Sequence, residues 1–554
     1  MNRRVAIWSG VIIAVLAVGW FAASKYWIYV PGILGEWRDP IGPAQEVKWD
    51  EGPETASVPA GKRPPNIVVI LADDLGYNDI TFNGGGVAGG AVPTPNIDSI
   101  GHDGVDFTNG YAGNATCAPS RAAIMTGRYA TRFGFEFTPA PVAFERLVGT
   151  FSTDKQIRKP IFHEDRVAEW PDDPNKLGVP AEETTIAELL KTQGYRTLLL
   201  GKWHLGGTPT SRPQAQGFDE FLGFLPGASM YLDPSDPRVV NSRQDFDPID
   251  RFLWANLPFA VRKDTGSRFE PKEYMTDYLA DEAVDAIHAN RNRPFFMYLS
   301  FNAPHTPLQA LKSDYDALPE IENHRLRVYA AMIRALDRGV GKVLDALKKE
   351  GLDENTLVIF TSDNGGAHYI GLDDINKPYR GWKATFFQGG IRVPFFMRWP
   401  ARISAGARYD EPVAHVDIFG TAAAAAGVAE PQDRVMDGRN LLQYVDGKEA
   451  GDPHKSLFWR SGDYMVLLSG DWKLQVSEKP KKDWLFNLKD DPTEQTNLAD
   501  SQPEKLAEMK AKLADVNGQQ AKPLWPSLLE GPIPIDHPLG EADSPNDEYI
   551  YWSN

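Results

Sequence analysis

Runs of consecutive apolar residues recur along the chain, and polar residues follow each run directly. Such runs occupy residues 67–71, 195–200, 294–301 and 356–362. A continuous apolar run indicates a strand that is buried on both faces, as in a parallel sheet. Stretches with helical spacing, such as residues 273–290 and 326–349, lie between the strands. This alternation predicts an α/β fold in which helices connect parallel strands.

The pattern changes at about residue 456, where short strands and turns replace the longer units. Strands are expected at residues 457–460, 464–468, 472–476 and 484–487, and a packing helix at residues 503–516. They predict a smaller antiparallel α+β subdomain with a tail at 456–554, after a main domain at 64–455. The tail beyond Pro523 is rich in proline and acids, so we expect it to wrap over the surface or to be disordered.

The first 30 residues have the pattern of an export signal. Arg3 and Arg4 precede residues 5–23, which are apolar or small and about long enough to cross a bilayer. We interpret residues 1–30 as an uncleaved signal-anchor or a cleaved signal peptide, and residues 31–63 as a proline- and glycine-rich tether. The basic residues would stay in the cytoplasm, so an exported, periplasmic protein anchored to the inner membrane is expected.

The net charge of the 554-residue chain is −17, and its pI is about 5.1. A body that binds nucleic acid would be basic, so no nucleic-acid partner is expected. An anionic substrate remains possible, because a few local cations can outweigh the overall charge.

Candidate functional side chains stand where the four apolar runs end. They are Asp73, Asp74, Lys202, His204, His305, Asp363 and Asn364. Open α/β sheets bind ligands at the carboxyl ends of their strands, so these side chains are expected to converge. Two adjacent carboxylates repel each other, and a hard divalent cation with oxygen ligands would offset that repulsion. Taken alone, Asp73 and Asp74 could equally be solvated residues of a turn.

Cys117 is the only cysteine in the sequence, which excludes an internal disulfide. Pro119 suits the first turn of a helix, and residues 122–125 favour helix. Cys117 would then lie at a helix N-terminus, where free N–H groups and the helix dipole favour an anion. A buried, inert thiol is the commoner fate of a free cysteine, so this segment alone leaves two interpretations open.

Together these segments resemble the type I, formylglycine-dependent sulfatases of the alkaline phosphatase-like superfamily. The similarity is carried by Cys-x-Pro-Ser-Arg and Thr-Gly-Arg at 117–128, Gly-Lys-Trp-His-Leu-Gly at 201–206, His-x-Pro-Leu at 305–308, and a lysine element ending in Gly-Gly-x-Arg-Val-Pro at 383–394. Gln388 departs from the pattern, because a glutamate is usual there, and this puts a local hydrogen bond in doubt.

The resemblance implies a large mixed, mostly parallel sheet sandwiched by helices, with the catalytic domain at 64–455. It implies that a maturation enzyme oxidises Cys117 to formylglycine, whose gem-diol attacks sulfur. The implied catalytic residues are Cys117, Arg121, Lys202, His204, His305, Asp363 and Lys383. The implied ligands of one Ca²⁺ are Asp73, Asp74, Asp363, Asn364 and an oxygen of matured Cys117.

The resemblance also implies how these groups share the reaction. Asp363 would activate the nucleophile, Arg121 would orient it, and Lys202, His305 and Lys383 would neutralise sulfate charge. His305 or Lys383 would protonate the leaving oxygen, and His204 would remove a proton to release sulfate.

The substrate would be a sulfated small molecule or glycan, and the sequence does not distinguish an aryl ester from a sulfated sugar. The loops at 135–180 and 208–260 are expected to bind it. One alternative is a phosphonate or phosphate ester hydrolase on the same fold. Another is an inactive, membrane-tethered protein that binds sulfated glycans.

Overall fold

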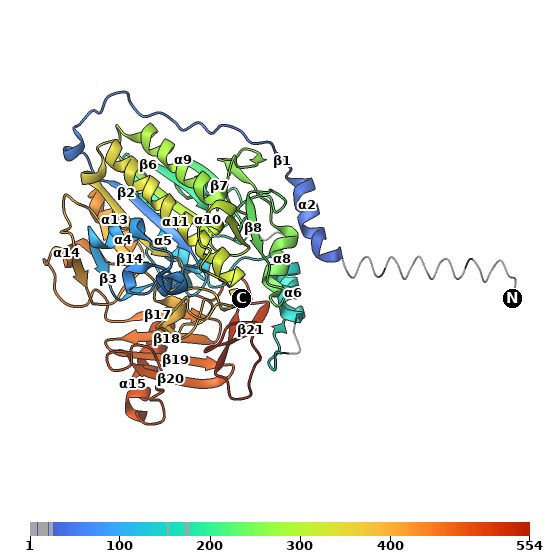
Figure 1. The fold of residues 1–554 in the computed structure, drawn as a ribbon. Helices are drawn as coiled ribbons and strands as arrows, with labels where there is room; N and C mark the ends of the chain where they lie inside the picture. The colour runs from blue at the N-terminus through green and yellow to red at the C-terminus, as the bar shows by residue number, and fades with distance from the viewer. Residues whose placement is uncertain (1–7, 9–19, 21–25, 152–154, 172–176) are drawn as a thin grey trace.

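An eleven-stranded sheet forms the centre of the molecule (Figure 1). It is seen in a computed structural model that describes residues 8, 20, 26–151, 155–171 and 177–554. In spatial order, the strands are β1 (Ile41–Gly42), β10 (Arg268–Phe269), β9 (Val261–Lys263), β7 (Glu220–Phe224), β6 (Arg196–Lys202), β11 (Phe295–Pro304), β2 (Asn66–Asp73), β13 (Thr356–Ser362), β14 (Phe395–Arg398), β3 (Val105–Phe107) and β15 (Ala407–Tyr409). The neighbours from β7 to β13 are all parallel, and antiparallel pairs occur outside them. The predicted mixed, mostly parallel sheet is confirmed.

The register of the central strands brings their carboxyl ends to one edge of the sheet. Ser300 of β11 pairs with Leu71 of β2 and with Gly201 of β6, and Ser362 of β13 pairs with Ala72. The polar residues that follow these strands therefore leave the sheet at nearly the same level along its edge. This register is what allows residues far apart in the sequence to share one site.

Helices cover both faces of the sheet, as the continuous apolar runs predict. Successive residues of β2 point to opposite sides, so Val68 lies in one core and Val69 in the other. The first core holds α4 (Pro95–His102), α9 (Met275–Asn290) and α11 (His324–Lys349). The second holds α5 (Cys117–Thr126), α7 (Ile186–Lys191) and α13 (Asp417–Ala426).

The C-terminal part forms a separate antiparallel sheet, drawn in orange and red in Figure 1. Its strands are β17 (Leu457–Ser461), β18 (Tyr464–Ser469), β19 (Trp472–Glu478) and β20 (Lys481–Asn487). Helix α15 (Pro503–Asn517) packs against β18 and β19. The predicted smaller antiparallel subdomain is thus present.

The tail beyond Pro523 is ordered, so of the two expectations, a wrapping and a disordered segment, the structure differs from the second. Strands β21 (Leu529–Pro534) and β22 (Tyr549–Ser553) pair with each other, and β21 also pairs with β5 (Ile161–Phe162). Strand β21 was not predicted, because prolines and a glycine interrupt its apolar residues and such residues disfavour a strand.

The prediction of an inner-membrane anchor is corrected here. Among the helices in the described part of the chain, none is long and apolar enough to cross a bilayer. This finding contradicts the predicted anchored, periplasmic location. Apart from Trp8 and Trp20, the segment 5–23 on which that prediction rested lies outside the described residues.

The segment predicted as a tether contains two ordered elements. Helix α2 (Val30–Arg38) lies beside α8 (Pro248–Asn256), where the Gly32 N–H donates a hydrogen bond to Asn256 Oδ1 at 2.7 Å. Strand β1 pairs with β10 at the edge of the large sheet. Part of residues 31–63 is therefore attached to the main body.

Candidate active site

The structure brings all ten predicted site residues into one buried cluster. None has more than 9% of its surface exposed. Most follow the carboxyl ends of β2, β6, β11 and β13, while Cys117 and Arg121 lie on α5. Lys383 comes from the loop between β13 and α12 (Gln388–Ile391). We call this cluster the floor; it consists of Asp73, Asp74, Cys117, Arg121, Lys202, His204, His305, Asp363, Asn364 and Lys383.

Cys117 is the first residue of α5, as predicted from Pro119. Its Sγ lies 3.6 Å from Asp73 Oδ1, 3.8 Å from Asp74 Oδ1 and 3.1 Å from Lys383 Nζ. Burial, together with the nearby Asp363 carboxylate, raises the pKa of the thiol to about 12. A catalytic cysteine that attacks as a thiolate requires a lowered pKa, so this thiol is poorly placed to act without modification.

Each of the three carboxylates in the floor pairs with at least one cation, and Arg121 also lies 3.4 Å from Asp73 Oδ1. Lys202 Nζ lies 2.7 Å from Asp73 Oδ2, Arg121 Nη2 lies 2.8 Å from Asp363 Oδ2, and Lys383 Nζ lies 2.8 Å from Asp74 Oδ1. Three negative and three positive charges therefore balance in a region where unpaired charges would be costly.

The carboxyl groups of Asp73 and Asp363 differ in pKa, because burial and the neighbouring cations act on them to different extents. Burial, the largest influence, raises the pKa of Asp73 to about 7 despite Lys202. At Asp363, burial acts in the same direction, but Arg121 and Lys202 outweigh it and hold the pKa below its usual value. Asp363 is thus kept ionised by neighbouring positive charge.

The donor atoms of the floor fit a divalent cation. One ligand atom each from Asp73, Asp74, Cys117 and His305 lies within 4.8 Å of all the others. The side-chain oxygen of Asn364 is buried without a hydrogen-bond partner, while its Nδ2 donates to Asp74 Oδ1 at 2.8 Å. Carboxylate and amide oxygens are ligands that hard cations prefer, and a buried oxygen without a partner is available as a further ligand.

The two predicted histidines reach the cluster in different ways. His305 Nε2 lies 3.6 Å from Asp74 Oδ2, and burial lowers the pKa of this histidine to about 3. His204 has a positive φ of 59°, because β6 ends at Lys202 and the chain turns there.

Ser300 and Tyr369 also contact residues of the floor, and neither was predicted from the sequence. Ser300 Oγ contacts Arg121 Nη1, and the Tyr369 hydroxyl donates to Asp74 Oδ2 at 3.0 Å. A polar residue within an otherwise apolar run was the available signal for Ser300. Tyr369 has no comparable local signal, because it lies in a short helical turn after β13.

The side chain of Gln388 is only partly hydrogen-bonded, because its Oε1 is buried without a partner among the described residues, while a carboxylate of the C-terminal subdomain contacts its backbone. The fully buried carboxylate of Glu494 accepts a hydrogen bond from the Gln388 backbone N–H at 2.6 Å and pairs with Lys473 at 2.7 Å. Gln388 Nε2 donates to the Tyr111 hydroxyl at 3.3 Å. A carboxylate is thus present beside this loop, although it comes from a distant part of the sequence.

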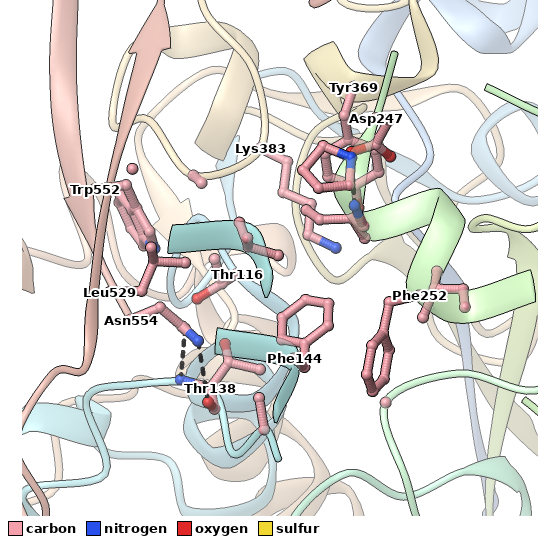
Figure 2. A pocket seen from close by; sticks show the side chains of 18 of the residues that line it. Thr116, Thr138, Phe144, Asp247, Phe252, Tyr369, Lys383, Leu529, Trp552 and Asn554 are labelled. Atoms are coloured by element: carbon pink, nitrogen blue, oxygen red, sulfur yellow. Dashed lines mark hydrogen bonds between the residues drawn. The ribbon is translucent and has the colours of Figure 1, made fainter. Parts of the chain in front are cut away.

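A cavity of about 340 Å³ opens onto the floor. Figure 2 shows Lys383 extending into it between side chains from separate segments. We call its apolar side the wall, formed by Phe144 of α6 (Val142–Thr150), Phe252 of α8, Leu529 and Ile533 of β21, and Trp552 of β22. Helices α6 and α8 lie in the predicted loop regions 135–180 and 208–260, whereas the contribution of the tail was not predicted.

The sequence of the chain matches a known family of hydrolases. The sulfatase family model matches residues 65–428, which is more than half of the chain. A second model, described as the C-terminal region of N-sulphoglucosamine sulphohydrolase, matches residues 381–519.

Individual relatives agree with this assignment. N-acetylgalactosamine-6-sulfatase of Canis lupus familiaris is 32% identical over 419 residues, covering 74% of this chain and 71% of its own. Steryl-sulfatase of Mus musculus is 32% identical over 491 residues, covering 75% and 71%. The crystal structure of Ps i-CgsB in complex with k-i-k-neocarrahexaose superposes with a TM-score of 0.68 at 33% identity, covering 84% of this chain and 95% of that one. This protein therefore belongs to the sulfatase family, and its chemistry is the hydrolysis of sulfate esters.

Proposed function

We propose that the floor hydrolyses a sulfate ester through a formylglycine made from Cys117. The observation that carries the proposal is the position of Cys117 at the start of α5, within 3.8 Å of Asp73, Asp74 and Lys383. Carboxylates beside a thiol disfavour the thiolate, whereas they suit a neutral hydroxyl nucleophile that must lose a proton.

Ca²⁺ is the proposed ion, with Asp73, Asp74, Asp363, Asn364 and an oxygen of matured Cys117 as its ligands. The set consists of hard oxygen donors, which favours calcium over softer transition metals. When bound, the ion would supply Lewis-acid stabilisation of sulfate oxygens. It would also add positive charge to a floor whose own charges cancel.

The protein groups have distinct proposed roles around this centre. Asp363, held ionised by Arg121 at 2.8 Å, would accept the proton of the nucleophile. Lys383, whose pKa is raised well above its usual value by Asp74 despite burial, would face the sulfate as a cation. Lys202 anchors Asp73, and His204, which lines the cavity, is the proposed base for sulfate release. Lys383 and His305 remain the two candidates for protonating the leaving oxygen.

Maturation of Cys117 must precede folding. Only 3% of the Cys117 surface is exposed, so a modifying enzyme has no access to the thiol in the folded protein. We therefore propose that a maturation enzyme acts on the unfolded segment 117–128. We also propose residues 64–455 as the catalytic domain and 456–554 as the C-terminal subdomain and tail.

The test compares a sulfate ester and a phosphate ester of the same alcohol, using protein coexpressed with a maturation enzyme. Peptide mass spectrometry first establishes how much Cys117 is converted. We expect sulfate release in proportion to the formylglycine content, and no release from Cys117→Ala. Faster phosphate release would instead support the phosphoester alternative, and full activity in thiol-only protein would contradict the proposed nucleophile.

A further inference from the structure

The cavity above the floor is lined mainly by carbon. Phe144 and Phe252 meet edge to face on one side, with ring centroids 5.2 Å apart. Leu529, Ile533 and Trp552 lie in the three-stranded sheet of β5, β21 and β22, which we call the tail sheet, and they are at most 7% exposed. Figure 2 shows the two phenylalanines on one side of the opening and Trp552 with Leu529 on the other.

Most polar side chains in the described lining are already engaged by the fold. The Asp247 carboxylate caps α8 by accepting hydrogen bonds from the N–H groups of Ile249 and Asp250, both at 2.9 Å. Asn554 accepts from the Thr138 N–H at 3.0 Å and donates to Glu145 Oε1 at 2.7 Å. These groups are therefore poorly available to a ligand.

Three buried side-chain atoms in the described lining have no hydrogen-bond partner: Thr138 Oγ1, His368 Nδ1 and, in the floor, His204 Nδ1. The two outside the floor can bind one or two polar substituents of a ligand. A sugar ring carries several hydroxyl groups, and each hydroxyl buried here without a partner would weaken binding.

The wall extends beyond the segments that define the family. The two family models end at residues 428 and 519, whereas Leu529, Ile533 and Trp552 follow both. The relatives are named for sugar as well as sterol substrates, so their names do not decide the alcohol. The class of alcohol is therefore inferred from the side chains of this wall.

We infer that the alcohol carried by the sulfate is an apolar ring system, such as a phenol or a fused-ring alcohol, and that the wall, including the tail sheet, selects it. The inference rests on the sulfatase function proposed above. A cavity of about 340 Å³ is large enough for such a ring system. Contact with rigid aromatic and aliphatic side chains would replace water around the ring, while the sulfate stays at the floor.

The experiment compares naphthyl sulfate with a sulfated galactose, using one matured preparation. We expect kcat/KM to be at least about 100-fold higher for naphthyl sulfate, given the usual worth of a well-filled apolar pocket. Equal or faster turnover of the sugar would overturn the inference while leaving the sulfatase function intact. If a fully matured sample hydrolyses neither ester, both proposals fall.

Substitutions in the wall test whether it determines the preference for naphthyl sulfate. Ile533→Thr replaces the ethyl branch of the side chain with a hydroxyl and should lower the naphthyl-to-galactose ratio about 10-fold, and Phe252→Ala should lower it by about 10- to 100-fold. Ile33→Thr makes the matched change at an exposed position (64%) away from the cavity and should leave the ratio unchanged. The ratio is independent of the fraction of folded enzyme, so partial unfolding does not mimic the effect. An unchanged ratio in both wall variants would contradict the assignment.

A binding measurement tests the inference without catalysis. Calorimetry on unmatured Cys117→Ser protein, which keeps an oxygen at this position, should show in the presence of Ca²⁺ tighter binding of naphthyl sulfate than of the sulfated galactose. Equal affinities would count against an apolar alcohol site.

Discussion

The floor and the wall line the same cavity, but they are built in opposite ways. The floor consists of charged and polar side chains at strand ends, and each of its carboxylates has a paired cation. The wall consists of apolar side chains from α6, α8 and the tail sheet. This difference indicates that the floor carries out the reaction and that the wall selects the alcohol. Substitutions in the floor should therefore lower activity on every ester, whereas substitutions in the wall should change the preference between esters.

The largest effect is expected from Asp74→Asn in the floor. The change keeps the size of the side chain, but it removes the negative charge that pairs with Lys383 at 2.8 Å. We expect kcat/KM to fall at least 100-fold for every sulfate ester, together with weaker Ca²⁺ binding, because loss of even an outer partner of a metal site costs about 10- to 100-fold. Metal content by mass spectrometry and kinetics on two esters check this.

Chelation provides the matching experiment on the wild type. Activity should disappear on both esters and return on addition of Ca²⁺. Full turnover in metal-free protein would rule out the proposed metal site. A loss confined to one ester would contradict the separation of floor from wall.

A smaller, substrate-dependent effect is expected from Phe144→Ala in the wall. It removes the ring that meets Phe252 at 5.2 Å. Inhibition by inorganic sulfate, which needs only the floor, should stay within about twofold, while KM for naphthyl sulfate rises about 10-fold. Parallel weakening of both ligands would show that the two regions are not independent.

A still more local effect is expected from Gly227→Ala. A Cβ at Gly227 would lie 2.7 Å from His204 Cε1 and 2.8 Å from its Nε2, so the imidazole must move. We expect kcat to fall about 10-fold with little change in KM, because misplacing a reacting group affects the chemical step more than binding. The neighbouring Ala228→Gly variant is the control. An unaltered kcat would show that the position of His204 is not critical.

The smallest effect is expected from a change at Asp79, a buried carboxylate outside the floor that has no ion-pair partner among the described residues. It accepts hydrogen bonds from the Gly76 N–H at 2.7 Å and the Tyr329 hydroxyl at 2.6 Å. Burial raises its pKa to about 8 from 3.8. The folded state thus binds the proton more tightly than the unfolded state, so stability is present at low pH and is lost between about pH 4 and pH 8.

Asp79→Asn should remove this contribution to the pH dependence. We expect Tm of the variant to rise by roughly 2–4 °C relative to wild type as pH increases from 5 to 8. Thermal melts at several pH values measure the difference. Parallel Tm curves for the two proteins would contradict the raised pKa of Asp79.

The sequence made most of the floor predictable, because strand ends can be recognised locally. The apolar run 67–71 identifies a buried strand, and the position of Asp73 and Asp74 after it follows directly. Tyr369 and Glu494 were not found, because they reach the site by long-range packing. The location was wrongly predicted, because it was taken from the N-terminal apolar pattern alone.

The sequence by itself determined which residues can do chemistry here, since their types and their places after buried strands are encoded locally. Only the tertiary structure decided how they are paired, because each ion pair in the floor joins separate segments. The tertiary structure also decided what lies above them. β21 is interrupted by prolines and has no clear apolar period, yet it pairs with β22 and β5 and presents Leu529 and Ile533 to the cavity. Local pattern identifies a strand by its own side chains, whereas the neighbours of β21 lie far from it in sequence.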